Sequence, residues 1–425
     1  MTERILNILK TTPGVSDYRL NTVVTKSYEL FFVHKKLETV RATDTASRNV
    51  TVYVKHGDFM GDYTFPVYVS QTDTEIAAKV ADAVKKAQLI DNPYYDLPAE
   101  GTLTAAADSN LESMPAEELG AKIADAAFAA SCYANGSINA LEVFLYRDEV
   151  SVINSRGTDK SEVRLHAMIE AIPTWNNGDE SVEIYEDHRF TEFDAAAITE
   201  EIDRKMQEVR DRCFAKAPNE KLTCPVVLNA PELAYLAMDL AGELNYASVY
   251  NKTNAFSKGD SLQKNPTGDL LNITLRGRMK GSVRSALFDA DGTAMTDTAV
   301  IEKGTAVGYY GASRFAQYLQ LPPTGNLPCA EVNVGTLTAE ELKAQPYFEC
   351  VSMSGLQLDI YNDYIGGEVR LAYYVNGDKK TPVTGISISG KLSDCLSEIR
   401  LSSTETVYGG YKGPDKALFT KIDIL

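Results

Sequence analysis

Two hydrophobic periodicities organise the first part of the chain. Residues 49–55 read NVTVYVK, in which apolar and polar side chains alternate with the period of two that a β-strand requires. Residues 76–87 instead carry apolar side chains at helical spacing, and Thr72 with Glu75 forms a capping-box pattern before them. We therefore expect strands followed by a helix that begins after Thr72. Strands with an amphipathic helix over one face predict an α+β layer.

The same succession returns between residues 115 and 216. Arg147-Asp148 is interpreted as a turn between two strands, and residues 91–114 as a connector because Pro93, Pro98 and Gly101 interrupt them. The predicted elements are an Ala-rich helix over 115–133, strands over 140–146, 150–154, 164–172 and 181–185, and a helix over 194–216. We expect an N-terminal α+β domain over 1–220, either one unit or two modules, 1–90 and 115–220, joined by linker 91–114.

The second half of the chain is richer in strands. Residues 223–229 predict a buried strand, and residues 231–244 a helix with Leu233, Leu236 and Leu240 on one face. From Leu270 onward, short apolar runs alternate with Gly, Pro and Asn turns, which favours a sandwich or barrel-like domain over 221–425. The predicted fold class is α+β, with antiparallel strands and covering helices in the N-terminal half and a β-rich C-terminal half.

Residues 288–326 hold the most distinctive motifs. An acidic turn at 289–292 is followed by a hairpin over 298–310, a short helix over 312–319 and a Pro-Pro-Thr-Gly-Asn turn at 322–326. The order of these parts, with PVTGISISG at 382–390, resembles the TldD/PmbA family. The resemblance covers most of the chain and rests on several short motifs in order. It implies a bacterial or archaeal cytosolic protein related to zinc metallopeptidase subunits, a family also known as modulators of DNA gyrase.

The zinc ligands of the peptidase branch are missing from this chain. In that branch a helix with H-E-x-x-x-H follows a strand like 223–229, and a cysteine near the C-terminus completes the site. The predicted helix 231–244 has no histidine, and Tyr408 stands where the cysteine would be. The four histidines all precede residue 190: His34, His56, His166 and His188. The resemblance therefore implies the TldE/PmbA branch, with no catalytic, cofactor or metal residues here and zinc only in a TldD-type partner.

The resemblance also implies residues that line a peptide-binding cleft. These candidates are Asn229, Glu232, Thr324, Asn326 and Tyr408.

Each of the other groups of polar residues has two possible interpretations. The acidic side chains Glu232, Asp239 and Glu243 are either paired carboxylates for acid–base chemistry or a solvated helix face. Similarly, the aspartates at 289, 291 and 297 form either a Ca²⁺ site or an acidic turn, and they lack the glycine and glutamate spacing of an EF-hand. As a nucleophile Cys329 would need a base, and no histidine is near it in sequence.

Composition narrows the functional classes. The net charge is −17 and the chain has no basic stripe, which excludes direct nucleic-acid binding through clustered Lys and Arg. Six scattered cysteines without a CxxC pair indicate reduced thiols. No apolar run reaches the roughly 20 residues of a membrane span, and the N-terminus MTERILNILK is not a signal peptide. We expect a cytoplasmic protein.

Three functions are consistent with these observations. The first is a zinc-free subunit that shapes a cavity for unfolded or small peptides, either as a homodimer or with a TldD-type zinc peptidase. The second is a non-enzymatic regulator that binds another protein, DNA gyrase being the named candidate. The third is a metal-free enzyme, so whether the chain has activity of its own stays open.

Overall fold

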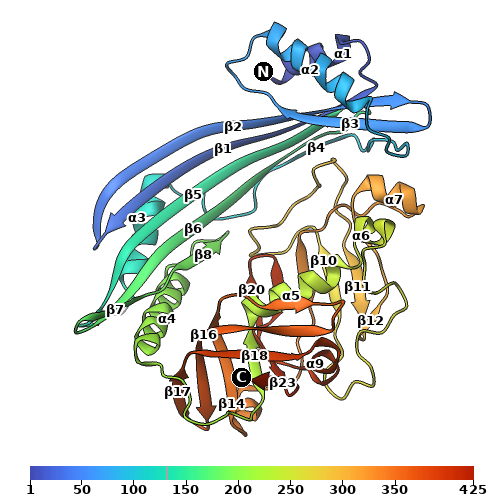
Figure 1. The fold of residues 1–425 in the computed structure, drawn as a ribbon. Helices are drawn as coiled ribbons and strands as arrows, with labels where there is room; N and C mark the ends of the chain where they lie inside the picture. Colours follow the sequence, from blue (N-terminus) through green and yellow to red (C-terminus); the bar gives the residue numbers. More distant parts are fainter. Residues whose placement is uncertain (131–132) are drawn as a thin grey trace.

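The computed structural model describes residues 1–130 and 133–425 of the chain. The N-terminal half is a long curved sheet that arches over the β-rich C-terminal half (Figure 1). The α+β prediction is confirmed.

The long sheet contains strands from both predicted N-terminal modules. Its order is β3-β2-β1-β5-β6-β4, with β7 and β8 also paired to β6, and every pairing is antiparallel except that of β4 with β6. Strand β3 lies at one edge of the sheet, where the hydrogen-bond ladder tolerates Pro66. The strands are β1 (Asp17–Val33), β2 (Lys36–His56), β3 (Phe59–Pro66), β4 (Thr102–Ala105), β5 (Gly136–Asn154), β6 (Asp159–Asn177), β7 (Glu180–Glu183) and β8 (Glu186–Phe190).

Two pairs of helices cover the ends of this sheet and create two apolar cores. One core packs α1 (Thr2–Thr11) and α2 (Asp73–Ala87) on β1 to β3, and the other packs α3 (Ala116–Phe128) and α4 (Ala195–Phe214) on β5 and β6. The predicted capping box at Thr72 is present, with both reciprocal hydrogen bonds to Glu75. The repeated helix-and-strand pattern therefore corresponds to two cores on one shared sheet.

One local prediction in this half is wrong. Arg147-Asp148 is not a turn, because both residues pair with β1 on one side and β6 on the other inside the continuous strand β5. Pairing on both sides holds this polar dipeptide extended, which its composition alone did not indicate. The connector 91–114 also contains a strand, β4, which extends the sheet beside β6.

The C-terminal half consists of two sheets around one large apolar cluster. Their orders are β12-β11-β10-β13-β21-β20 and β19-β22-β9-β14-β16-β18-β23, with β15 and β17 paired to β16. The helix α5 (Ala230–Gly242) contributes Leu233, Leu236 and Leu240 to the cluster, as its spacing predicts. The first sheet contains β10 (Ile273–Arg276), β11 (Thr298–Glu302), β12 (Thr305–Ala306), β13 (Cys329–Val332), β20 (Glu405–Tyr408) and β21 (Tyr411–Pro414). The second contains β9 (Val226–Asn229), β14 (Tyr347–Met353), β15 (Gln357–Asp359), β16 (Tyr364–Asn376), β17 (Lys379–Val383), β18 (Ile386–Lys391), β19 (Arg400–Leu401), β22 (Lys416–Phe419) and β23 (Ile422–Ile424). The other helices are α6 (Tyr246–Asn251), α7 (Ser313–Leu319), α8 (Ala339–Lys343) and α9 (Leu392–Glu398).

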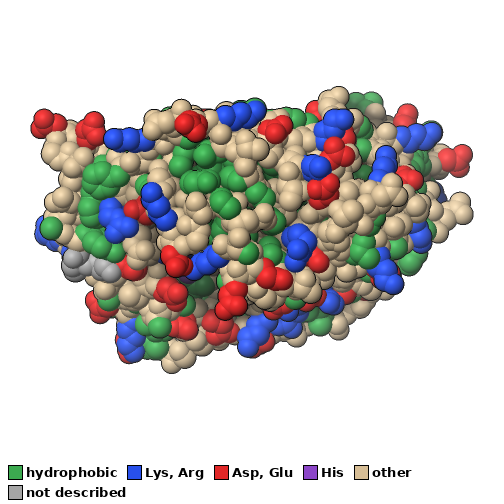
Figure 2. All heavy atoms as spheres, turned by 90° about the horizontal axis from the view of Figure 1, so that it is seen from below, with side chains coloured by type: hydrophobic (Ala, Val, Ile, Leu, Met, Phe, Trp, Pro, Cys, Tyr) green, Lys and Arg blue, Asp and Glu red, His purple; other side chains and the backbone are tan. Residues whose placement is uncertain are grey.

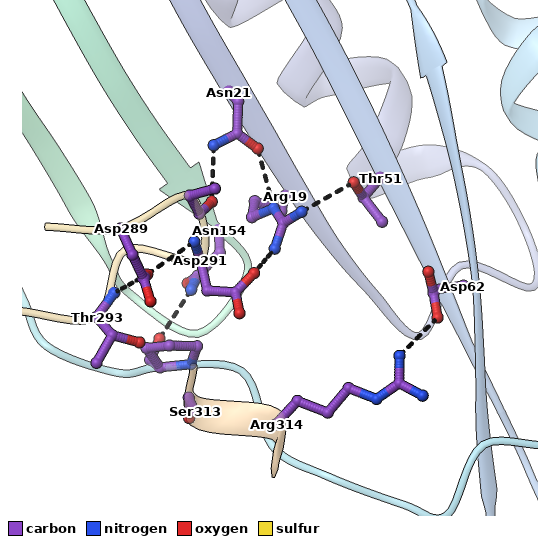
Figure 3. A network of polar contacts seen from close by, with 12 residues as sticks. Arg19, Asn21, Thr51, Asp62, Asn154, Asp289, Asp291, Thr293, Ser313 and Arg314 are labelled. Carbon is purple, nitrogen blue, oxygen red and sulfur yellow. Dashed lines mark hydrogen bonds and ion pairs between the residues drawn. The ribbon is translucent and has the colours of Figure 1, made fainter. Parts of the chain in front are cut away.

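The acidic turn at 289–292 joins the two halves (Figure 3). The Asp289 carboxylate accepts hydrogen bonds from the amides of Asp291 and Thr293 at 2.9 and 3.0 Å, which fixes the turn. Arg19 of β1 then forms an ion pair with Asp291, and Asn21 donates to the carbonyl of Ala290 at 2.7 Å. The turn is therefore one of the points at which the C-terminal half is attached to the curved sheet.

Exposed charges of both signs are interspersed on the face of the molecule shown in Figure 2. No helix in the described part of the chain is both long and apolar enough to cross a membrane. The cysteines that the structure describes are free thiols, and Cys132 lies outside the described residues.

Candidate functional site

The N-terminus of α5 presents two polar side chains that the local backbone leaves without full hydrogen bonding. Strand β9 runs directly into α5, and Asn229 is the N-cap residue, yet its side chain does not cap the helix. Its Nδ2 instead donates to the carbonyl of Cys350 on β14 at 2.8 Å. Among the described residues no donor reaches the buried Oδ1 of Asn229 or the buried Oε2 of Glu232. Two buried acceptor oxygens that lack a donor therefore lie one helical turn apart.

Burial changes the protonation of Glu232. Removal of its carboxyl from water raises the pKa of Glu232 to about 7. The backbone amides of Glu232 and Asn229 and the ammonium of Lys205 oppose this rise. Near neutral pH the side chain therefore exists in both the acidic and the ionised form, and it can donate or accept a proton.

Tyr408 completes this side of the site from β20. It is 49% exposed. Burial of the remainder, together with the carboxylates of Glu186 and Glu232, raises the pKa of Tyr408. The structure thus brings Glu232 and Tyr408 into one electrostatic environment, which they share with Glu186 of the curved sheet.

A group of charged side chains on β8 and α4 forms what we name the β8–α4 cluster. Lys205 of α4 contacts Glu186 of β8 and Glu208 of α4, both at 3.1 Å. Its members are Glu186, His188, Glu201, Arg204, Lys205 and Glu208. Lys205 also acts electrostatically on the Glu232 carboxyl, so the charge of the cluster is felt at the N-terminus of α5.

The pKa values of Glu186 and Glu201 in this cluster shift in opposite directions. Burial raises the pKa of Glu186 to about 7, against the opposing effect of Lys205. Burial also disfavours ionised Glu201, but Arg204, Lys205 and His188 hold the pKa of Glu201 below its ordinary value. Burial lowers the pKa of His188, against the opposing effect of the Glu201 carboxylate.

The other two predicted cleft residues lie at the acidic turn instead. Thr324 Oγ1 accepts from the amide of Gly311 at 2.9 Å, and the amide of Asn326 donates to Asp289 at 3.2 Å. No hydrogen bond or ion pair within residues 1–130 and 133–425 joins these two residues to Asn229, Glu232 or Tyr408. Thr324 and Asn326 therefore contact other residues of the C-terminal half, and Asn326 supports the turn that Asp289 forms.

Four other polar candidates contact protein partners: Glu243, Asp291, Asp297 and Cys329. Asp297 pairs with Arg276 at 2.8 Å, as Asp291 does with Arg19, and Glu243 accepts from the amide of Ala255. The Cys329 thiol is buried 3.3 Å from the hydroxyl of Ser282, and burial raises its pKa. These contacts favour structural roles for all of them.

Sequence reasoning considered His188 alone and missed its neighbours. The signal was present: Glu186 and His188 are two apart on a strand and so share a face, and Glu201 follows within the next helix. The pairing of that strand with that helix was not predictable from spacing.

The family model that matches this chain covers its C-terminal half. Residues 221–424 match the PmbA/TldA metallopeptidase C-terminal domain. No curated protein sequence matches the chain. The crystal structure of TldE from Thermococcus kodakarensis is similar over 99% of both chains, with a TM-score of 0.80 and 14% identity.

Two further solved structures share the fold. A protein proposed as a modulator of a DNA gyrase from Thermotoga maritima MSB8 is similar over 100% of both chains, with a TM-score of 0.77 and 14% identity. Another proposed modulator of DNA gyrase, from Bacteroides thetaiotaomicron VPI-5482, matches 99% of this chain and 97% of its own, with a TM-score of 0.76 and 12% identity.

Proposed function

Because its C-terminal half belongs to the PmbA/TldD family, we propose that this chain is a TldE-type subunit that works without a catalytic zinc of its own. Its partner is a TldD-type subunit that holds the zinc, and their substrate is an unfolded or small peptide. The proposed setting is the cytoplasm, and the chain alone forms a homodimer.

One observation carries this proposal: the side chains at the start of α5 do not suit the zinc of a metallopeptidase. A catalytic zinc needs three good ligands, usually imidazoles, thiolates or carboxylates, and an open position. Here the helix offers the amide of Asn229 and the carboxyl of Glu232, with the phenol of Tyr408 nearby. Only one of the three is an ordinary zinc ligand, so no step of peptide cleavage is assigned to this helix.

The same side chains are suited to holding a peptide. The unpartnered oxygens of Asn229 and Glu232 accept hydrogen bonds from peptide N–H groups or from an N-terminal amine. The half-exposed ring of Tyr408 offers apolar contact area at a small entropic cost. In this role the chain orients a substrate while its partner supplies the chemistry.

A regulatory function is the second candidate. It is favoured by the two solved relatives proposed as modulators of DNA gyrase and by the net charge of −17, which suits docking on a basic partner. It requires no peptidase partner, so the two proposals differ in what the chain binds.

Affinity capture from a native cell extract tests the first proposal. We expect the tagged chain to bring down a homologue that carries H-E-x-x-x-H, identified by mass spectrometry, at close to one copy per chain. The matched variant Glu232→Gln should retain that partner. Capture of a gyrase subunit, or of the chain alone, would overturn the peptidase proposal, and gyrase would favour the regulator.

A further inference from the structure

The ligand atoms of Glu186, His188 and Glu201 converge in the β8–α4 cluster, all lying within 4.8 Å of one another. We propose that these three side chains bind one divalent transition-metal ion, with Zn²⁺ as the expected ion. This site is on the N-terminal half and is separate from the helix α5 considered above.

The secondary structure directs these three side chains to one place. Residues two apart on a strand share a face, so Glu186, His188 and Phe190 of β8 point the same way. Phe190 is buried in the core that α3 and α4 cover, which shows that this face of β8 is turned toward α4. Glu201 reaches the same point from the second turn of α4. The alternate residues Asp187 and Arg189 pair with each other at 2.7 Å on the opposite face.

The donor set suits a borderline metal ion. Two carboxylates and one imidazole are ligands that Zn²⁺ accepts, with bonds of about 2.0–2.2 Å, whereas Mg²⁺ and Ca²⁺ prefer oxygen alone. Neither ring nitrogen of His188 has a hydrogen-bond partner among the described residues, so a lone pair is free to coordinate. Small rotations of the two glutamates close the remaining distance, because both are on the rim of the core and partly solvated.

The cations in the cluster do not block the site. Lys205 lies 3.1 Å from Glu208 as well as from Glu186, and Arg204 lies 2.6 Å from Glu208 as well as contacting Glu201. Glu208 can therefore hold both cations while Glu186 and Glu201 turn to a metal ion. Three carboxylates face two cations here, and Glu232 adds a fourth carboxyl from α5. When all four are ionised, a divalent ion would balance the charge.

A bound ion would tie β8 to α4 and leave a coordination position for water or for a substrate carboxylate. Three protein ligands leave a fourth position open in a tetrahedral site. The Tyr408 phenol and the Glu232 carboxyl both lie within the electrostatic range of this cluster.

Calorimetric titration of the full chain with ZnCl₂ in a thiol-free reducing buffer tests this site. We expect one zinc per chain with micromolar or tighter affinity, and binding at least about tenfold weaker in Glu201→Gln and in His188→Ala. The matched control is His166→Ala, because His166 is also a half-buried histidine of the curved sheet, beside the single carboxylate Asp148 at 3.7 Å. This control should bind zinc as the unaltered chain does.

Thermal unfolding supplies a second readout that does not depend on peptidase activity. Zinc should raise the Tm of the unaltered chain and of His166→Ala, and should leave Glu201→Gln unshifted. Absence of zinc binding, or equal binding by all variants, would overturn the proposal. A chain that binds zinc here yet cleaves no peptide alone would leave the TldE-type function intact, so failure of either proposal is recognised separately.

Discussion

Replacement of Glu232 by glutamine should stabilise the protein at neutral and alkaline pH, but not at acidic pH. Burial raises the pKa of Glu232 from its ordinary 4.5 to about 7 in the folded state. A group with a raised folded pKa adds stability that is fully present below the ordinary pKa and is lost as pH rises through the folded pKa. The ionised form therefore penalises folding progressively between pH 4.5 and about 7.

The size of the effect follows from the same two values. Each pH unit between them corresponds to about 1.4 kcal/mol, so the full difference is about 3 kcal/mol above pH 7. Glutamine is nearly isosteric and carries no charge, so Glu232→Gln should gain up to about 3 kcal/mol at pH 8 and close to nothing near pH 4.5. The control Glu302→Gln removes an exposed carboxylate and should be neutral at both pH values.

Urea unfolding followed by circular dichroism measures this difference. The one tryptophan, Trp175, belongs to β6 of the curved sheet, so its fluorescence would not report on α5. The expected result is a higher urea midpoint for Glu232→Gln at pH 8 and an unchanged midpoint at low pH. Equal shifts at both pH values, or a lower midpoint at pH 8, would refute the reasoning that burial of this carboxyl costs free energy.

Three further substitutions test how the fold is held together. Gly292→Val should destabilise the chain by at least about 2 kcal/mol, measured as a lower urea midpoint, because a Cβ there would lie 2.7 Å from Thr158 at a φ of +89°. Arg314→Lys should lower the Tm and cost about 1 kcal/mol, since lysine loses the planar contact with three aromatic rings and the 2.7 Å hydrogen bond to Asn92. Thr72→Ala should cost about 1 kcal/mol by removing the capping box of α2, seen as faster amide exchange in its first turn; unchanged exchange would contradict that role.

Short sequence patterns predicted the elements that interactions between neighbouring residues determine. The α2 helix begins after Thr72 because its cap and its apolar face are both encoded within fifteen residues. The acidic turn at 289–292 was likewise recognisable from its glycine and aspartates, and the structure shows the amide of Gly292 donating to the carbonyl of Asp289 at 3.0 Å.

Contacts between segments that are distant in the sequence determined the other elements and the candidate site. The extended course of β5 through Arg147 depends on Lys26 of β1, which precedes it by more than a hundred residues, and on Leu165 of β6, which follows it by 18. The candidate site shows the same limit, because Glu232 and Tyr408 share an environment only through folding of the C-terminal half. The sequence did not predict the β8–α4 cluster for the same reason, because no residue near His188 in the sequence indicates that Glu201 lies beside it.

A peptidase assay with the chain alone and with a TldD-type partner tests whether this chain works as a zinc-free subunit. We expect no cleavage of an unfolded peptide by the chain alone, with or without added zinc. Cleavage should appear when the H-E-x-x-x-H partner is added, and it should disappear with a chelator. Cleavage by the chain alone, or equal cleavage by the partner with and without this chain, would contradict the account.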